Sequence, residues 1–353
     1  MNPYRWLPMV AALLCLQACA TAPAASASPS ADGEVIPANE AAATAAVTAH
    51  IRASITEGFQ REGHAFRDAH RKAHGCVSAQ FTVLDNVSPQ LAHGVLAKPR
   101  SFGAVIRFSN GSQQDDRKGD ARGMAIKLLG VDGPKLLSDE PEARTQDFLL
   151  MNHPVFFVRD AADYVGFQQA TSGNTLQLLG WLTRHLFHES AILLNIKRKT
   201  VTNPLDSPYW STTPSKLGPQ AIKFSARPCA GSRFANAFTS PDLLRENMTA
   251  HLATTGACFD FMVQAQADPS SMPIEDPTIE WDANQSPFVP VARIQIPTQA
   301  PEQGEACEAR SFTPWHTLAE HRPLGGISRM RKAVYQEGSR LRHQLNGQPR
   351  TEP

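Results

Sequence analysis

The stretch from residue 328 to residue 342, SRMRKAVYQEGSRLR, places Tyr335 among five basic residues. A phenol titrates near pH ~10, so an ordinary surface tyrosine is neutral and needs no neighbouring cations. Fixed positive charge favours the ionised form, and a phenolate is a strong anionic ligand. The stretch therefore predicts a helix that presents a tyrosinate, and it raises the question of what that oxygen binds.

The same predicted helix carries two arginines on the face of Tyr335. Residues advance by ~100° along a helix, which brings Arg331 and Arg342 onto that face. Arg331 is placed to donate to the phenolate oxygen, and Arg342 is placed to hold a carboxylate through two nitrogens. This combination suits heme, whose iron takes an anionic ligand and whose propionates take guanidinium groups. Taken alone, however, the stretch is more simply a solvated basic helix with an incidental tyrosine.

The composition bounds the class of protein. The 353 residues are 42% hydrophobic and 19% charged, with a formal net charge of +1. The near-neutral charge gives no basis for binding nucleic acid. Beyond residue 25, no run approaches the ~18 apolar residues of a membrane span. We expect a globular domain over residues 47–347, followed by a short tail over residues 348–353.

The pattern of strands and helices indicates a single α+β domain built on a sheet or a closed barrel. Alternating runs rich in β-branched and aromatic residues predict seven strands, at 77–84, 101–110, 123–131, 145–152, 220–227, 258–266 and 289–297. Apolar residues at helical spacing predict helical segments at 47–75, 160–195, 240–255 and 325–345.

The first residues have the pattern of an export signal, with Arg5 before an apolar run and small residues after it. The sequence LQAC at 16–19 resembles a bacterial lipoprotein processing site. This predicts a signal peptide over residues 1–18 and a lipidated Cys19 at the outer membrane, in the periplasm. Cleavage by ordinary signal peptidase at the nearby ACA or ASA is the alternative. Residues 19–46, rich in Ala, Ser, Pro and Thr, are expected to form a disordered tether.

Four cysteines remain in the expected domain: Cys76, Cys229, Cys258 and Cys307. An oxidising compartment and an even count permit two disulfides, but the sequence does not determine the pairing. Isolated buried thiols stay open as the alternative. Because no C-x-x-C occurs, a zinc ribbon is not expected.

Five motifs together resemble those of the catalase superfamily, and they occur in the family's order. They are RDAHRKAHG (67–75), VIRFSNG (105–111), DARGMAIKLLG (120–130), NHPVFFVRDAADY (152–164) and RKAVY (331–335) followed by SRLR. The resemblance spans roughly residues 60–345, and the length fits the short, catalase-like heme peroxidases. It implies a catalase-like antiparallel β-barrel core with surrounding helices, and heme b as the cofactor.

The resemblance also implies which residues hold the heme. Tyr335 matches the proximal iron ligand, and Arg331 matches the arginine bonded to its oxygen. Three arginines match the positions that pair with the heme propionates: Arg67, Arg107 and Arg342. Three aromatic residues match the wall of the pocket: Phe156, Phe157 and Tyr164, the last in place of the family's usual phenylalanine.

On the opposite, distal side, His70 matches the histidine that takes a proton from hydrogen peroxide and returns it to the leaving oxygen. His74 is its rival, because it would lie one turn later on the same face of the predicted helix. Ser109 matches the serine that orients the distal imidazole. The family's usual distal amide is replaced by Met151, so Asn152 is expected to take that role after a small shift in register.

These departures bear on the expected activity. Ala69 stands where the family usually has valine, which should widen the pocket. We therefore expect a heme peroxidase with residual catalase activity. It would reduce hydrogen peroxide or small organic peroxides through a ferryl intermediate, with a small-molecule electron donor as its partner.

Three alternatives remain open. One is a heme enzyme that converts lipid hydroperoxides, and another is a non-catalytic heme-binding protein. The third is a metal site built from His70 and His74, although it lacks the glutamate of H-E-x-x-H and a third ligand nearby.

Overall fold

The structure is a computed structural model that describes residues 30, 32–139, 143–173, 175–185, 188–232, 234 and 236–349. The predicted signal peptide and Cys19 lie outside the described residues, as do residues 350–353 of the expected tail. Among the described residues, no helix has the length and apolarity needed to cross a membrane.

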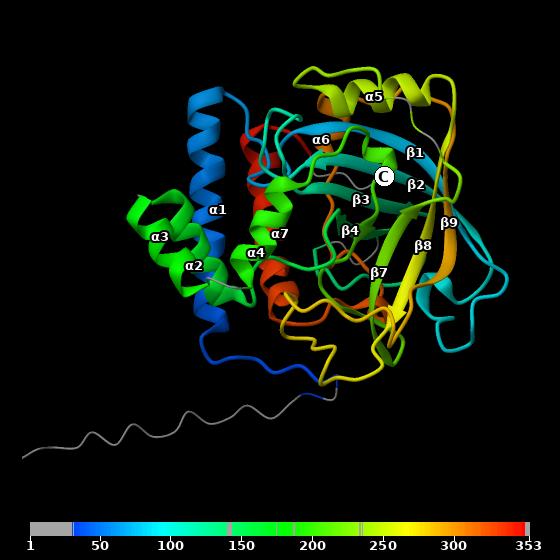
Figure 1. Ribbon diagram of the computed structural model, residues 1–353, viewed down its shortest axis with the longest axis horizontal. Coiled ribbons are helices and arrows are strands. Elements are labelled where there is room, and N and C mark those ends of the chain that lie inside the picture. The colour runs from blue at the N-terminus through cyan, green and yellow to red at the C-terminus, as the bar shows by residue number, and fades with distance from the viewer. Residues whose placement is uncertain are drawn as a thin grey trace, which may run out of the picture.

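The centre of the fold is an antiparallel β-barrel (Figure 1). The sheet order is β5-β4-β3-β2-β1-β9-β8-β7-β6, and an additional pairing of β5 with β7 closes the barrel. The strands are β1 (Ala73–Val83), β2 (Ser101–Asn110), β3 (Arg122–Leu129), β4 (Thr145–Met151), β5 (Tyr209–Trp210), β6 (Ser215–Leu217), β7 (Gln220–Pro228), β8 (Ala257–Ala265) and β9 (Val289–Ile296). Each of the seven predicted strands is confirmed. The short strands β5 and β6 were not predicted, because two or three residues are too few to show alternation.

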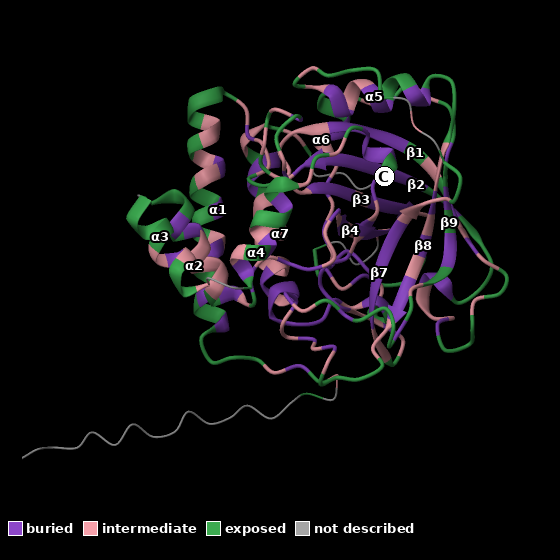
Figure 2. Cartoon of the chain, in the orientation of Figure 1, coloured by how far each residue is buried: buried purple, intermediate pink, exposed green. Residues whose placement is uncertain are grey.

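The inside of the barrel is a packed apolar core, which appears as the buried strands in Figure 2. Phe148 lies at its centre, with its ring centroid 5.0 Å from that of Phe261 and 5.2 Å from that of Phe224. Phe81 packs against Phe261 at 5.1 Å. Because side chains alternate along a strand, the intervening residues of these strands point outward, and those of β4 face the helices.

The described residues form seven α-helices around the barrel: α1 (Glu40–Glu62), α2 (Ala161–Ser172), α3 (Thr175–Arg184), α4 (Glu189–Arg198), α5 (Leu243–Leu252), α6 (Glu305–Ala309) and α7 (Gly326–Leu345). Three short 3₁₀ helices span Gly94–Leu96, Pro204–Asp206 and Ala319–His321. Helices α1 to α4 and α7 lie together on one side of the barrel, whereas α5 packs near β1 (Figure 1). The predicted C-terminal helix is confirmed as α7.

The helix predicted over residues 47–75 is wrong at both ends, because α1 spans Glu40–Glu62. It ends at Gly63, whose left-handed φ of 69° lets its N–H cap the carbonyl of Phe59. The residues that follow form a non-helical segment that leads into β1. The motif at 67–75 therefore does not lie on a helix.

The disordered tether expected over residues 19–46 is also wrong for residues 32–46, which are ordered. Arg329 on α7 explains this order, because it donates to Glu34 at 2.6 Å and to Glu40 at 2.7 Å. Both carboxylates are nearly buried. The composition of residues 32–46 did not predict this order, because it depends on the specific contacts of Glu34 and Glu40 with Arg329.

The four cysteines of the domain form two disulfides, Cys76–Cys307 and Cys229–Cys258. The first joins β1 to α6 across 231 residues of sequence, and the second joins the end of β7 to β8. The alternative of isolated buried thiols is therefore wrong.

Candidate active site

A cavity of about 240 Å³ lies against the outer face of the barrel, between strands β2 to β4 and helices α1, α2 and α7. The outward residues of the three strands form two rows across the sheet, Ser109–Gly123–Met151 and Arg107–Ala125–Leu149. All six line the cavity. Gly123 and Ala125 belong to β3, the middle one of the three strands, and their small side chains leave room for the cavity.

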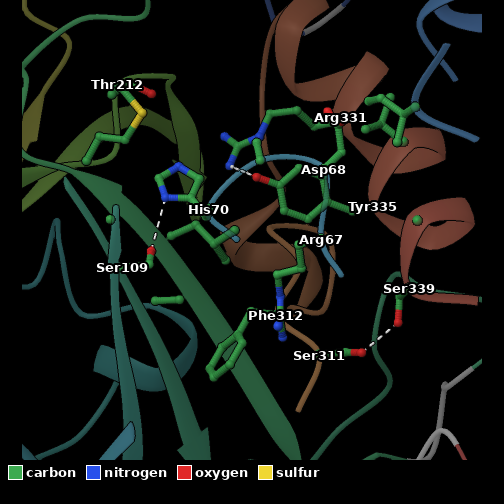
Figure 3. Close-up of a pocket in the computed structure, with 18 of the residues that line it drawn as sticks. Arg67, Asp68, His70, Ser109, Thr212, Ser311, Phe312, Arg331, Tyr335 and Ser339 are labelled. Carbon is green, nitrogen blue, oxygen red and sulfur yellow. Dashed lines mark hydrogen bonds between the residues drawn. The ribbon is translucent and has the colours of Figure 1, made fainter. Parts of the chain in front are cut away.

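Tyr335 enters this cavity from α7, together with Arg331 one turn earlier (Figure 3). Arg331 Nη2 donates to Tyr335 Oη over 3.1 Å, and its guanidinium carbon lies 5.1 Å from the ring centroid. The predicted contact between the two residues is therefore confirmed. A donor fixed at this oxygen suits an oxygen that acts as an anionic ligand.

His70 faces the same space from the barrel side, opposite Tyr335 (Figure 3). Its Nδ1 lies 3.1 Å from Ser109 Oγ, and its main-chain N–H donates to the carbonyl of Gly111 at 2.8 Å. Its φ is 58°, a left-handed conformation that residues other than glycine rarely adopt. The imidazole is thus held by both its side chain and its backbone.

Gly123 makes room for this imidazole. A Cβ atom at position 123 would lie 2.6 Å from His70 Nδ1 and 2.8 Å from Ser109 Oγ, which is closer than van der Waals contact allows. The glycine belongs to the motif DARG, but the sequence alone gave no reason for it. The reason is that β3 and the histidine segment approach each other at this point.

Burial, aided by the positive charge of Arg107 and opposed by Asp120, lowers the pKa of His70 to about 4. The ring is therefore neutral at pH 7. Since Nδ1 lies at Ser109, Nε2 is the nitrogen left to accept a proton from a ligand in the cavity.

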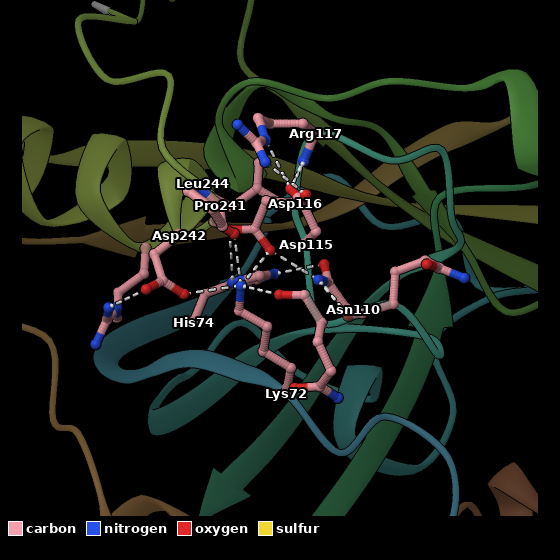
Figure 4. Close-up of polar contacts among 12 residues, drawn as sticks. Lys72, His74, Asn110, Asp115, Asp116, Arg117, Pro241, Asp242 and Leu244 are labelled. Atoms are coloured by element: carbon pink, nitrogen blue, oxygen red, sulfur yellow. Dashed lines mark hydrogen bonds and ion pairs between the residues drawn. The ribbon is translucent and has the colours of Figure 1, made fainter.

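His74 lies in a buried polar network outside the cavity (Figure 4). Its Nε2 is 2.9 Å from Asn110 Oδ1, and its Nδ1 is 3.9 Å from Asp116 Oδ2. Lys72 Nζ completes the network 2.8 Å from Asp116. Because His74 belongs to β1 rather than to a helix, it does not share a face with His70. The interpretations of His74 as a rival of His70 and as a second metal ligand are both wrong.

The three arginines predicted to bind propionates do converge, but on a carboxylate of the chain itself. Arg107 Nη2 donates to Glu308 Oε1 at 2.8 Å, and Arg67 pairs with Glu308 Oε2. Arg342 Nη1 donates to the main-chain oxygen of Glu308 at 2.5 Å. The arginines line the cavity. Sequence reasoning missed Glu308 because it lies outside all five motifs.

The charges of this cluster perturb one another. Burial raises the pKa of Glu308, but the charges of Arg67 and Arg107 lower it more, so the carboxyl group stays ionised. Burial lowers the pKa of Arg342 to about 10, against the opposing effect of Glu308. Both groups remain charged at pH 7, and three guanidinium groups with one carboxylate leave a net charge of +2.

An aromatic wall closes another side of the cavity. The ring centroids of Phe156 and Phe157 lie 4.7 Å apart, and those of Phe157 and Tyr164 lie 5.7 Å apart. All three side chains line the cavity, as predicted, and so does Ala69. Burial raises the pKa of Tyr164, so its phenol is neutral.

Asn152 is only 1% exposed and is not among the described residues that line the cavity. Its Oδ1 accepts the main-chain N–H of Arg122 at 2.7 Å, so it ties the end of β4 to the start of β3. Met151 faces the cavity in its place. The expected shift in register does not occur, and the prediction that Asn152 supplies the distal amide is wrong.

The structure adds polar residues that no motif marked as functional. Asp68 lines the cavity next to Arg67 in the sequence. Ser311 and Ser339 also line it, with their hydroxyl oxygens 2.6 Å apart (Figure 3). These single serines and the aspartate carry no spacing signal that would have set them apart in the sequence.

The residues of the cavity fit the predicted heme. Heme needs an axial ligand, apolar contacts and cationic partners for its carboxylates. Tyr335, the α1 residues Val47, Ile51 and Ile55, and the arginine cluster are of these types. Moreover, Arg107 Nε is buried and has no hydrogen-bond partner among the described residues, which leaves a donor for a further carboxylate.

Comparison with solved structures shows that the fold is that of catalases. A fungal catalase aligns with a TM-score of 0.63 and 18% identity over 82% of this chain and 63% of its own. A bacterial catalase aligns with a TM-score of 0.63 and 19% identity over 84% and 62%. Catalase A from Saccharomyces cerevisiae aligns with a TM-score of 0.61 and 17% identity over 82% and 65%.

The chain therefore spans less than two thirds of the length of these catalases. No family model matches the sequence, and no curated protein matches it either. The predicted α+β fold with a catalase-like antiparallel barrel is confirmed by the alignments.

Proposed function

We propose that the protein is a heme-dependent oxidoreductase that acts on hydrogen peroxide or small organic peroxides. One observation carries the proposal: the Arg331-bonded phenol of Tyr335 and the Ser109-held imidazole of His70 face one cavity from two sides. The catalase-like fold supports it. Bound heme b would supply the redox chemistry that cleaves the O–O bond of the peroxide.

In this proposal the residues of α7 and the arginine cluster hold the cofactor. Tyr335 Oη would bind the iron, and its hydrogen bond from Arg331 would fix that oxygen. Arg67, Arg107 and Arg342 would hold the heme carboxylates through charge-assisted hydrogen bonds. The aromatic wall and the apolar face of α1 supply the remaining contacts and exclude water.

His70 moves the proton of the reaction. Its neutral Nε2 accepts a proton from one oxygen of the peroxide and gives it to the other, which leaves as water or alcohol. The pKa of about 4 keeps this base in its active form at any pH above that value. Ser109 and the carbonyl of Gly111 keep the ring aimed at the cavity.

The walls of the cavity favour oxidation of an organic donor over disproportionation. Rapid disproportionation requires a second peroxide to be held in place beside the histidine, a task suited to an amide. In the described part of the chain, no asparagine or glutamine lines the cavity, and Met151 and Ala69 occupy its wall. We therefore assign peroxidase activity as the main activity and catalase activity as residual.

The proposed location is the periplasm, with a lipid anchor at Cys19. The two disulfides support export, because such bonds form and persist in oxidising compartments.

The test uses one preparation for binding and for both activities. Hemin is titrated into the purified protein, and we expect the Soret band to saturate at one heme per chain. Peroxide consumption is then measured with guaiacol as the donor, and oxygen evolution is measured without it. Donor oxidation should exceed oxygen evolution. Failure to bind hemin would contradict the proposal, and oxygen evolution without donor oxidation would reverse the order of the two activities.

A further inference from the structure

Glu308 occupies the position in the arginine cluster where a ligand carboxylate is expected. Its two carboxylate oxygens pair with different arginines, Oε1 with Arg107 at 2.8 Å and Oε2 with Arg67. These are charge-assisted contacts of the kind that a heme propionate would make with the same side chains. A carboxylate of the chain and the carboxylates of the cofactor therefore use one set of donors.

We propose that Glu308 is a built-in competitor for the carboxylates of the cofactor, so that it weakens and thereby tunes heme binding. This inference rests on the proposed function, since it concerns the same cavity. The side chain yields the donors of Arg67 and Arg107 when heme enters, and it takes them back when heme leaves.

The surroundings of Glu308 restrict this exchange to its side chain. The neighbouring Cys307 is bonded to Cys76 of β1, and the main chains of Cys76 and Glu302 exchange two hydrogen bonds of 2.9 and 2.7 Å. Arg310 pairs with Glu302 at 3.0 Å. The backbone of α6 is thus fastened to the barrel, and opening of the whole helix is not needed.

The side chain itself is not fully enclosed. It is 19% exposed, and that of Arg67, which also lines the cavity, is 18% exposed. Rotation of the glutamate toward water would free Nη1 of Arg67 and one N–H of Arg107 Nη2, without disturbing the main-chain contact of Arg342. Arg67 Nη2 would keep its bond to the carbonyl of Arg310. Arg107 would keep its 2.9 Å bond to the carbonyl of His70, so the proton-transfer side of the cavity would stay in place.

Charge gives the sign of the effect. With Glu308 in place, the cluster carries a net +2, which two propionates neutralise. Without the glutamate, the net charge of +3 attracts the same two propionates more strongly, and no like charge lies beside them. Neutralising Glu308 should therefore tighten the binding of a porphyrin with two free carboxylates and give no such gain to a porphyrin whose carboxylates are blocked.

The test compares two ligands and matched variants of the full chain. Hemin and hemin dimethyl ester, whose carboxylates are blocked, are titrated into the wild type, Glu308→Gln and Glu305→Gln and followed at the Soret band. Glu305 lies on the same helix and is exposed, so it controls for a general loss of negative charge. Thermal melts establish that each variant is folded. Glu308→Asp, which keeps the charge but shortens the side chain, is the second variant should Glu308→Gln fail to fold.

We expect Glu308→Gln to bind hemin about tenfold more tightly than the wild type, which corresponds to about 1.4 kcal/mol. Glu308→Asp should bind it with intermediate affinity, and Glu305→Gln should match the wild type. The dimethyl ester should bind all four proteins equally.

Unchanged or weaker hemin binding by Glu308→Gln would overturn the competitor role, as would an equal gain for the dimethyl ester. Should Glu308→Gln not fold, hemin binding by Glu308→Asp at or below the wild-type affinity overturns it instead. A wild type that binds no hemin contradicts the proposed function itself, so the two failures are distinguishable.

Discussion

His70 and His74 lie four residues apart, and both have a pKa that burial lowers to about 4. The surroundings of the two rings differ. His70 borders an open cavity and touches Ser109, whereas His74 is completely buried against Asn110 and Asp116 (Figures 3 and 4). The comparison teaches that a shifted pKa does not by itself mark a functional histidine. Accessible space beside the ring separates the two.

The largest expected effect in this comparison is on catalysis. His70→Ala removes the proton acceptor and should lower the rate of peroxide reduction by about 10²–10⁴-fold. It should leave hemin affinity and the melting temperature nearly unchanged, because the ring borders the cavity. Stopped-flow kinetics measures the rate, a hemin titration measures the affinity, and a thermal melt measures the melting temperature. A variant that reduces peroxide at the wild-type rate would remove His70 from the mechanism.

The matching substitution of His74, in the buried polar network, should affect the stability of the protein instead of its activity. His74→Ala leaves a small void and takes a partner from Asn110 Oδ1, which should lower the free energy of unfolding by about 2–3 kcal/mol. Urea denaturation of the apoprotein at pH 7 measures this loss. Peroxide reduction by the folded, heme-loaded variant should stay within about threefold of the wild type. A stable His74→Ala protein that has lost activity would reverse the roles of the two histidines.

The pH dependence of stability sharpens the comparison further. The unfolded pKa of a histidine is near 6.5 and the folded pKa of His74 is about 4, so the unfolded chain binds more protons between these values. The free energy of unfolding must therefore fall as the pH drops below 6.5. Because His74→Ala removes one such group, its deficit relative to the wild type should shrink by about 1.4 kcal/mol per pH unit between 6.5 and 4. Denaturation curves at pH 7, 6 and 5 measure this deficit. A deficit that is constant with pH would show that the pKa of His74 is the same in the folded and the unfolded protein, which would contradict the lowered pKa.

The smallest effect concerns the space around His70. Gly123→Ala forces a methyl group against the imidazole and should displace it, which should slow peroxide reduction by about tenfold while hemin still binds. Gly103→Ala is the control, because a Cβ atom there meets only Leu129, at 3.7 Å. Peroxide reduction and hemin affinity of both variants provide the comparison. Equal rates for the two would mean that the position of the imidazole does not limit the reaction.

The sequence predicted the barrel well because its strands alternate clearly. It placed all seven longer strands, and the spacing of Arg331 and Tyr335 predicted a contact that is present at 3.1 Å. The sequence predicted poorly where the side chains of His70 and His74 point. The segment after Gly63 has the spacing of apolar residues that is typical of a helix, but it is not helical. Local pattern does not reveal that the chain adopts a left-handed conformation at His70 to reach Gly111.

Contacts between residues far apart in the chain could not be predicted either, because they leave no local pattern in the sequence. Glu308 reaches the arginine cluster because the neighbouring Cys307 is bonded to Cys76, 231 residues earlier in the sequence. No local feature of the sequence distinguishes Glu308 from Glu305. Asn152 was misassigned because the resemblance fixed its position only to within one residue, and one step along a strand reverses the side-chain direction. Residue type and spacing therefore locate a site, but the facing elements determine its partners.

The claim that Tyr335 binds the heme iron is tested most directly by visible absorption spectra of the ferric, hemin-loaded protein and its Tyr335→Phe variant. Tyr164→Phe is the control, because that phenol also lines the cavity. The wild type and Tyr164→Phe should share high-spin ferric bands with tyrosinate charge transfer, and Tyr335→Phe should lack them. A Tyr335→Phe spectrum identical to that of the wild type would contradict the assignment of Tyr335 as the iron ligand.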